Sequence, residues 1–428
     1  MKKYKKYLLL LVTCFAMVMV VFYGFNPGDS MAGDIQYPVV CYEGDELSKV
    51  KAWEKQWVGK RIDASNIEGV QEFFPENYYK ILKDKEKWGS MWFEIVPYRQ
   101  MMPTPGDIKY TKQFAGKPKV GSDGNLVDYV SGTPFPNAKT AMELMYNFDN
   151  VSFGDNTLII QDIALIDGIR KYDKRMYAPS HQVFFSNRRE IPPVPEVTPN
   201  KKEIYRASHS EYFEPAGMRG SRWLSIKWID RLRDFGGWSY SAGVRRIVRR
   251  STAQRLDAVG GGDATGEDTT IYGWAIPAQD YKLLGRKELL VGRHQNADLL
   301  AKGHTEGIIL YSGIQRERIN TYVIEAIPKD PDHIYSKSIY YMDPETWWLV
   351  YSDKYDTQGE LWKVFENVQS NIKSIFSDVF VPSVLFALTI DVVRTHGTVF
   401  FSPMKIGETG DKYKFGYYTP RALQKYGY

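Results

Sequence analysis

The chain has 428 residues, of which 43% are apolar, 14% aromatic and 25% charged. This composition is typical of a folded globular protein and excludes a disordered one. Of the formal net charge of +5, three charges come from the first 32 residues, where four lysines face a single aspartate. The remaining +2 is too small to produce the broad basic surface of a nucleic-acid-binding protein, and we expect no nucleic-acid partner.

The N-terminus has the three parts of a signal peptide. The basic sequence MKKYKK precedes the uncharged and largely apolar residues 7–25, and Ser30 and Ala32 have the spacing that signal peptidase requires. We predict that residues 1–32 are a signal peptide cleaved after Ala32. A retained anchor is the alternative, because 19 apolar residues can span a bilayer. A lipid-modified Cys14 is the third interpretation, and all three predict export to the periplasm.

Cysteine usage agrees with export. Cleavage would remove Cys14 and leave Cys41, so no intrachain disulfide can form. We expect Cys41 to be a surface or partly buried thiol.

Residues 33–131 form a predicted N-terminal helical and turn-rich region. Ser65 and Glu68 have the spacing of a capping box before a helix that Pro75 interrupts. A second short helix, with Tyr78, Ile81 and Leu82 on its apolar face, is predicted at 77–87, a first strand at 91–97, and turns at 103–136.

Residues 132–428 form the predicted β domain. A short helix is expected at 138–148 and a strand at 156–163, and the proline-rich residues 191–199 are expected to connect an N-terminal half to a C-terminal half. After residue 204 short alternating segments follow one another, as in Leu224, Ile226 and Trp228, with a hairpin turn at 356–359. Strands joined by short turns pair antiparallel. The predicted fold is therefore mainly antiparallel β (α+β), a strongly curved sheet with helices covering its concave face.

No catalytic or metal-binding constellation is found in the sequence. The six histidines have no metal-ligand spacing. The segment GWSYS (237–241) resembles a nucleophile elbow but ends in serine and lies in a predicted strand. The glycines 260–262 lack a phosphate-loop tail and are expected to form a flexible surface loop. We therefore predict no enzyme, no metal and no cofactor.

The basic cluster GVRRIVRR (243–250) alternates as a strand would. Arg245, Ile247 and Arg249 are expected on one face, and Arg246, Val248 and Arg250 on the other. Two interpretations stay open: a solvated edge with salt bridges to the acids at 263, 267 and 268, or contact with phosphate or carboxylate head groups of a lipid.

The aromatic residues are equally ambiguous, because they either fill a core or line a cavity for acyl chains. We predict the cavity wall and mouth in the strand 238–250 and the segment 268–288. The candidate ligand-binding residues are Trp228, Trp238, Tyr240, Arg246, Arg250, Tyr272, Trp274 and Tyr281.

Several segments together resemble one family, the bacterial domain of unknown function 1329 (DUF1329), placed with LolA/LolB-like outer-membrane lipoprotein-sorting proteins. The matching segments are GTPFPNAKTAMELMYNF (132–148), WSYSAGVRRIVRRS (238–251), DTTIYGWAIPAQDYKLLGRKELLV (268–291), YYMDPETWWLVYSDKYDTQGELWKVFE (340–366) and YTPRALQKYGY (418–428). The resemblance covers about residues 60–428. Tyr146 and Trp274 depart from its usual pattern.

The resemblance implies a curved, incompletely closed LolA-like β-barrel with a hydrophobic cavity, in the periplasm or at the outer membrane. It also implies an RND-type transporter or an outer-membrane β-barrel as partner. We therefore expect a non-catalytic carrier of lipid or another hydrophobic molecule. The alternatives are a structural or adaptor subunit of an envelope lipid-transport complex, and an envelope hydrolase.

Overall fold

The computed structural model describes residues 35–168, 171–298 and 309–425. The described residues from Gln36 onward belong to one compact unit. The predicted signal peptide lies outside the described residues. Among the helices that are described, none is both long and apolar enough to cross a membrane.

Sixteen strands of the described residues form a single sheet. Its first strands are β1 (Arg61–Asp63), β2 (Trp92–Ile95), β5 (Asn156–Asp167), β6 (Lys171–Phe184), β7 (Ile204–Glu211), β8 (Arg222–Trp228), β9 (Gly236–Ser241) and β10 (Arg246–Arg249). The others are β11 (Gln279–Gly292), β12 (Ile314–Pro328), β13 (Lys337–Met342), β14 (Leu349–Tyr355), β15 (Leu361–Lys373), β16 (Phe380–Asp391), β17 (His396–Phe401) and β18 (Met404–Ile406). β3 (Lys119–Val120) and β4 (Leu126–Val127) pair separately.

The sheet is antiparallel at every described pairing except that of β2 with β12, which is parallel. From β12 the order runs β13-β14-β15-β16-β17-β5-β6-β7-β8-β9-β10. β11 pairs along the other side of β12, so β10 and β11 stand at opposite ends of the described sheet without pairing. The predicted mainly antiparallel, incompletely closed sheet is confirmed.

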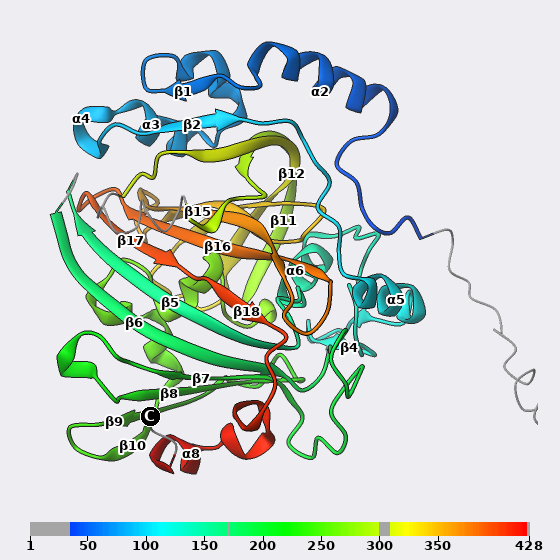
Figure 1. Cartoon of the computed structure of the whole chain (residues 1–428), viewed down its shortest axis with the longest axis vertical. Coiled ribbons are helices and arrows are strands. Elements are labelled where there is room, and N and C mark those ends of the chain that lie inside the picture. Colours follow the sequence, from blue (N-terminus) through cyan, green and yellow to red (C-terminus); the bar gives the residue numbers. More distant parts are fainter. Residues whose placement is uncertain (1–34, 169–170, 299–308, 426–428) are drawn as a thin grey trace, which may run out of the picture. The chain divides into compact units, whose positions relative to one another are not determined.

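The N-terminal helices pack on one face of this sheet (Figure 1). They are α2 (Gly44–Trp57), the 3-10 helix η1 (Ile67–Phe73), α3 (Glu76–Lys83) and α4 (Lys85–Trp88). The apolar side chains of η1 and α3 share one core with the sheet residues Tyr351, Val364 and Leu388.

The predicted capping box at Ser65 is wrong. Helix η1 begins after Asn66 without a side-chain cap, because the Ser65 hydroxyl donates to Asp63 Oδ1 at 2.6 Å. The predicted helix 77–87 is real but broken in two at Asp84, and β1 precedes the predicted first strand.

The other face of the sheet carries α6 (Ala141–Asp149), whose start has a true capping box between Thr140 and Glu143. α6 contacts β11 at one end of the sheet, and its Asp149 pairs with Lys227 on β8 near the other end. One short helix can reach both ends only where the sheet bends around it, so this is the concave face (Figure 1). The helix α5 (Pro105–Phe114) precedes α6, and α8 (Pro420–Lys425) packs against β8, β9 and β10.

Three local expectations need correction. The proline-rich residues 191–199 join β6 to β7, which are neighbours in one sheet, so they do not separate two halves. The glycines 260–262 do not form a free surface loop, because a Cβ at Gly260 would collide with Met176 and one at Gly262 would lie 2.7 Å from the Thr398 hydroxyl. Cys41 is buried.

Candidate ligand-binding face

A segment of 3-10 turns, residues 251–278, leaves the edge strand β10 and enters the opposite edge strand β11. We call it the strap. Its short 3-10 helices are η3 (Thr252–Leu256), η4 (Val259–Gly261), η5 (Gly266–Ile271) and η6 (Ile276–Ala278). Because the strap connects the two unpaired ends of the sheet, its path across the concave face decides what that face can bind.

The first half of the strap crosses β6, β5 and β17. Lys174 on β6 donates to the Gly260 carbonyl at 3.1 Å, and the missing side chain of Gly262 makes room for Leu165 on β5. Asp263 then accepts from the Thr398 hydroxyl of β17 at 2.8 Å and lies 2.6 Å from His396 Nδ1. The strap is thus fixed to these strands mainly by polar contacts.

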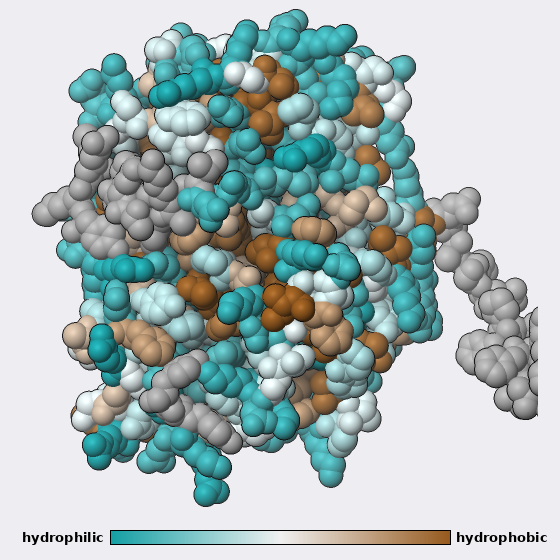
Figure 2. All heavy atoms as spheres, viewed as in Figure 1, coloured by the Kyte–Doolittle hydropathy of each residue, from teal (hydrophilic) through white to brown (hydrophobic). Residues whose placement is uncertain are grey.

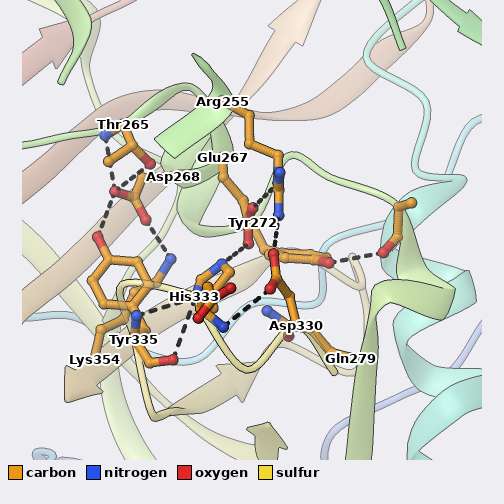
Figure 3. Close-up of polar contacts among 12 residues, drawn as sticks. Arg255, Thr265, Glu267, Asp268, Tyr272, Gln279, Asp330, His333, Tyr335 and Lys354 are labelled. Carbon is orange, nitrogen blue, oxygen red and sulfur yellow. Dashed lines mark hydrogen bonds and ion pairs between the residues drawn. The ribbon is translucent and has the colours of Figure 1, made fainter. Parts of the chain in front are cut away.

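The second half is held over β14 and β15 by a buried carboxylate, Asp268 (Figure 3). Asp268 pairs with Lys354 of β14, lies 3.9 Å from the ammonium group of Lys363 of β15, and accepts from the Tyr335 hydroxyl at 2.8 Å. Burial acts to raise the pKa of Asp268, but the two lysines outweigh it and hold the pKa below its usual range. The carboxylate therefore stays ionised and binds two strands at once.

Glu267 makes a second buried contact beside it (Figure 3). One of its oxygens lies 3.1 Å from His333 Nε2, and the other accepts from Arg255 Nε at 3.0 Å. Arg255 also reaches Asp330 at 3.4 Å. The strap is therefore tied to the β12–β13 connection as well as to itself.

Aromatic residues follow where the strap approaches β11. The ring of Tyr272 lies 6.0 Å from that of Tyr340 on β13, and the ring of Trp274 lies 4.7 Å from that of Phe235 in the β8–β9 loop. Tyr281 on β11 packs into the same apolar cluster as α6. Side-chain contacts, rather than strand pairing, thus close the gap between the two ends of the open sheet.

The C-terminal end of α6 is fixed by a buried charge cluster. Asp149 pairs with Lys227 and with Arg231, whose Nε lies at 2.8 Å. Burial lowers the pKa of Lys227 to about 7, against the opposing effect of Asp149. The second cover of the concave face, α6, is therefore also held by ion pairs.

The eight predicted site residues divide between the two faces of the sheet. Trp228, Trp238 and Tyr240 lie on the outer face, in a cluster with Tyr417, Tyr418 and Leu423 of the C-terminal segment. Tyr272, Trp274 and Tyr281 belong to the concave-face cluster. The structure therefore does not bring the eight together into one site. A role in binding stays a prediction for the residues on the concave side, whereas Trp228, Trp238 and Tyr240 lie on the opposite face.

The two arginines of the set lie on the concave side of the edge strand. The register pairs Arg249 with Trp238 of the outer face, so the alternate residues Arg246 and Val248 face the other way. Arg250 follows them and stacks at 4.9 Å over Trp223. Arg245 belongs to the turn before the strand, at φ +52°.

The expected salt bridges of this basic cluster are not made. The three acids considered as its partners are engaged by other groups: Asp263 by His396 and Thr398, Glu267 by Arg255 and His333, and Asp268 by Lys354 and Lys363. Within the described part of the chain, no ion pair is formed by Arg245, Arg246 or Arg249. The solvated-edge interpretation therefore loses its proposed acidic partners.

The interior of the concave face is filled by side chains. Ile324, Tyr340 and Met342 have no exposed surface. Two small cavities lie elsewhere among the described residues, with volumes of about 30 Å³ and 40 Å³, each enough for a few water molecules. Neither is lined by α6 or the strap. The buried side chains Ile324, Tyr340 and Met342 thus leave no room for a hydrophobic molecule between them while α6 and the strap stay in place.

Buried acid clusters elsewhere resemble catalytic or metal sites but have structural partners. Cys41, Asp343 and Glu345 come close enough to share a cation, yet Arg293 already pairs with both carboxylates. Burial and these acids raise the pKa of Cys41 well above its usual value, so the thiol stays protonated. The segment 237–241 is a strand, as predicted, and not a nucleophile elbow.

Sequence reasoning missed the charged residues that hold the covers. Lys354 and Lys363 pair directly across β14 and β15, and Lys363 lies between Trp362 and Val364. A lysine flanked by apolar strand residues, as at 363, was the available signal, since buried lysines require an acidic partner; no such signal marks Lys354.

The fold and this face define the class of the protein: a curved, open antiparallel sheet whose concave face is covered by a helix and a strap. The chain belongs to DUF1329, described as proteins of unknown function, whose family model matches residues 61–424. The family resemblance found in the sequence is thereby confirmed.

Similar proteins include an uncharacterized protein of Pseudomonas aeruginosa, 24% identical over 339 residues that cover 74% of this chain and 70% of that protein. Solved structures with some likeness include a DUF1329 protein from Desulfovibrio piger, 16% identical with a TM-score of 0.47, covering 66% of this chain and 96% of that one. A candidate outer-membrane lipoprotein-sorting domain from Vibrio parahaemolyticus is 12% identical, also with a TM-score of 0.47, covering 66% and 97%. A LolA superfamily protein from Nitrosomonas europaea is 15% identical with a TM-score of 0.38, covering 65% and 100%.

Proposed function

We propose that this protein is a periplasmic carrier that binds a lipid or another hydrophobic molecule on its concave face, without covalent chemistry. The observation that carries the proposal is the way this face is covered. Its aromatic and aliphatic cluster is covered by two separate pieces, α6 and the strap, and buried ion pairs hold each piece to the sheet. Neither piece belongs to the sheet, so each can move without breaking strand pairing.

The free energy of burying an acyl chain is large enough to replace the contacts that are lost when a cover moves. Burial of a chain of about sixteen carbons contributes on the order of 10 kcal/mol, at about 0.8 kcal/mol per methylene. Displacement of the strap exposes part of the apolar cluster, whose contacts an acyl chain then replaces. The polar groups that hold the strap through Asp268 and Asp263 become hydrated when the strap moves away, which limits the free energy lost when these contacts separate.

The predicted signal peptide and the family support a periplasmic setting. In the periplasm, a carrier of this kind exchanges its ligand with a membrane component, for which an RND-type transporter or an outer-membrane β-barrel is our proposed partner. The proposal assigns no residue a catalytic role.

Two tryptophans on opposite faces provide a matched test. Trp274 lies at the mouth of the concave face, while Trp238, which is also half-buried, lies on the outer face under the C-terminal segment. Native mass spectrometry of protein taken directly from the periplasm is expected to show a bound lipid. Trp274→Ala should weaken binding of palmitate about tenfold or more, since a large apolar contact is worth about 1.5–3 kcal/mol.

The control is Trp238→Ala, which should bind palmitate as the unmodified protein does. Equal loss in both variants, or protein that carries no lipid and binds no palmitate, would contradict the carrier proposal.

Exposed apolar residues favour an adaptor as the second candidate function. The β15–β16 connection exposes Ile375 and Phe376 by 61% and 48%, and Phe380, the first residue of β16, is 53% exposed. The connection contacts β18 through a hydrogen bond from the Ile375 backbone N–H. Figure 2 shows apolar residues at the surface where Figure 1 places β18. If no lipid is found, loss of partner binding in the double variant I375S/F380S would support the adaptor.

A further inference from the structure

The hairpin of β9 and β10 ends the sheet at the bottom of the view in Figure 1. Most residues of its tip, 242–245, and of its second strand are exposed. Val244 is 74% exposed and Val248 is 51% exposed. Arg245, Arg246 and Arg249 are exposed beside them.

The charge of this hairpin is uncompensated. No ion pair to these three arginines is formed by the described residues, and Asp263, Glu267 and Asp268 of the strap are engaged by other groups. The neighbouring β7–β8 turn contacts the tip, because a Cβ at Gly220 would lie 3.4 Å from the Ala242 methyl group. That turn adds the exposed Arg219. Cations and aliphatic groups therefore alternate along this projecting edge of the sheet, with Arg249 on its outer side and Arg246 and Val248 on its concave side.

Protection of the sheet edge explains the arginines of this hairpin but not its exposed valines. Charged residues on an edge strand prevent pairing with a second molecule, which accounts for the arginines. Protection does not account for two valines exposed by half or more at the same edge, because exposed aliphatic residues promote association. A surface that combines both is suited to an anionic membrane, where guanidinium groups pair with lipid phosphates and aliphatic side chains enter the interface.

We propose that the β9–β10 hairpin docks this protein onto a bilayer that contains anionic phospholipid. Arg245, Arg246 and Arg249 bind head-group phosphates, and Val244 and Val248 insert between the lipids. The occupant is inferred from charge complementarity and from the depth of exposure of the two valines. Docking does not depend on the proposed ligand, since a protein with an empty concave face keeps the same hairpin.

Vesicle co-sedimentation with the mature chain tests the proposal. Binding is expected to vesicles of phosphatidylcholine mixed with phosphatidylglycerol and not to phosphatidylcholine alone. The triple variant R245A/R246A/R249A should lose about 100-fold in partition coefficient, since each basic residue near such a surface contributes roughly fivefold. Added salt should weaken binding of the unmodified protein, and V244S/V248S should weaken it at high salt as well.

A matched triple variant on the N-terminal layer, K49A/K55A/K85A, removes the same charge from exposed positions and should keep its binding. Equal loss in both triple variants would show general charge attraction and overturn the docking site. Failure of the unmodified protein to bind phosphatidylglycerol vesicles would overturn it as well, and an unchanged V244S/V248S variant would overturn the insertion of the valines. None of these results bears on palmitate binding, which is measured separately.

Discussion

Asp353 on β14 illustrates what a single buried group does in this sheet. It is 4% exposed, and Asn77 of α3 donates to its Oδ2 at 2.8 Å. Burial raises the pKa of Asp353 to about 6, Asn77 opposes the shift and Glu76 adds to it. Its ionised form is thus destabilised in the folded protein.

We predict that Asp353→Asn stabilises the protein at pH 8. The folded-state pKa lies above the unfolded value of 3.8, so the folded form binds the extra proton and stability is lost as the pH rises through about 6. The amide removes this loss, worth at most about 3 kcal/mol. Urea unfolding should show the gain at pH 8 and little change at pH 4. A gain of equal size at both pH values would contradict the role of ionisation, and Asp45→Asn on the exposed side of α2 is the control.

At this scale the sequence predicted apolar positions better than charged ones. The buried faces of Tyr78, Ile81 and Leu82 followed from helical spacing, because apolar burial depends on local periodicity. The partners of Lys354 and Lys227 could not be predicted, since Asp268 and Asp149 come from distant segments that only the folded sheet brings together.

Among the elements, the C-terminal segment depends on two buried histidines that face each other across β6 and β7. His181 and His209 are register partners, and the ring of His209 lies 4.3 Å from that of Tyr417. Burial lowers the pKa of His209 to about 3, with Arg222, His181 and Lys412 adding to the effect. The C-terminal segment therefore packs on neutral imidazoles.

We expect the protein to lose stability between pH 7 and pH 5, and His209→Phe to reduce that loss. The unfolded histidine binds a proton below about 6.5 while the folded one does not, so stability falls as the pH falls, by about 2 kcal/mol per such histidine at pH 5. Chemical unfolding across this range should give a shallower slope for the variant. An unchanged slope would show that His209 is accessible to protons in the folded state.

Most elements were predictable, but the strap was not. The strands after residue 204 followed from alternation and turn residues, because these signals are local. Only the glycines 260–262 were expected to form a loop, and residues 251–278 were not predicted as one segment, since 3-10 turns have no apolar period and the path of the strap depends on ion pairs with distant strands. The predicted site residues were divided between the two faces for the same reason.

Across the whole molecule, Arg316 joins the N-terminal layer to the sheet. It is buried on β12, pairs with Glu366 of β15 and donates to the Tyr351 hydroxyl at 2.6 Å, while Tyr78 of α3 donates to the same glutamate. One ion pair thus connects a helix with three strands.

We predict that Arg316→Met costs about 3–5 kcal/mol of unfolding free energy, because Glu366 is left charged and unpaired in the core. The double variant R316M/E366M should be clearly more stable than the single one, since it removes both charges. Thermal unfolding compares them. A double variant no more stable than the single one would mean that the side chains stabilise the layer by shape and not by charge.

The mainly antiparallel open sheet was predictable from local turns, whereas the parallel pairing of β2 with β12 was not, because nothing near either strand encodes it. This pairing joins Phe93 to Ile314. An emerging chain has to wait for most of its length before β2 finds its neighbour, and long-range pairing of this kind slows folding. During that wait the N-terminal helices expose their apolar sides. If the chain is exported unfolded, as its predicted signal peptide implies, it would need a holding chaperone in the periplasm. The yield of folded protein should then depend on that chaperone.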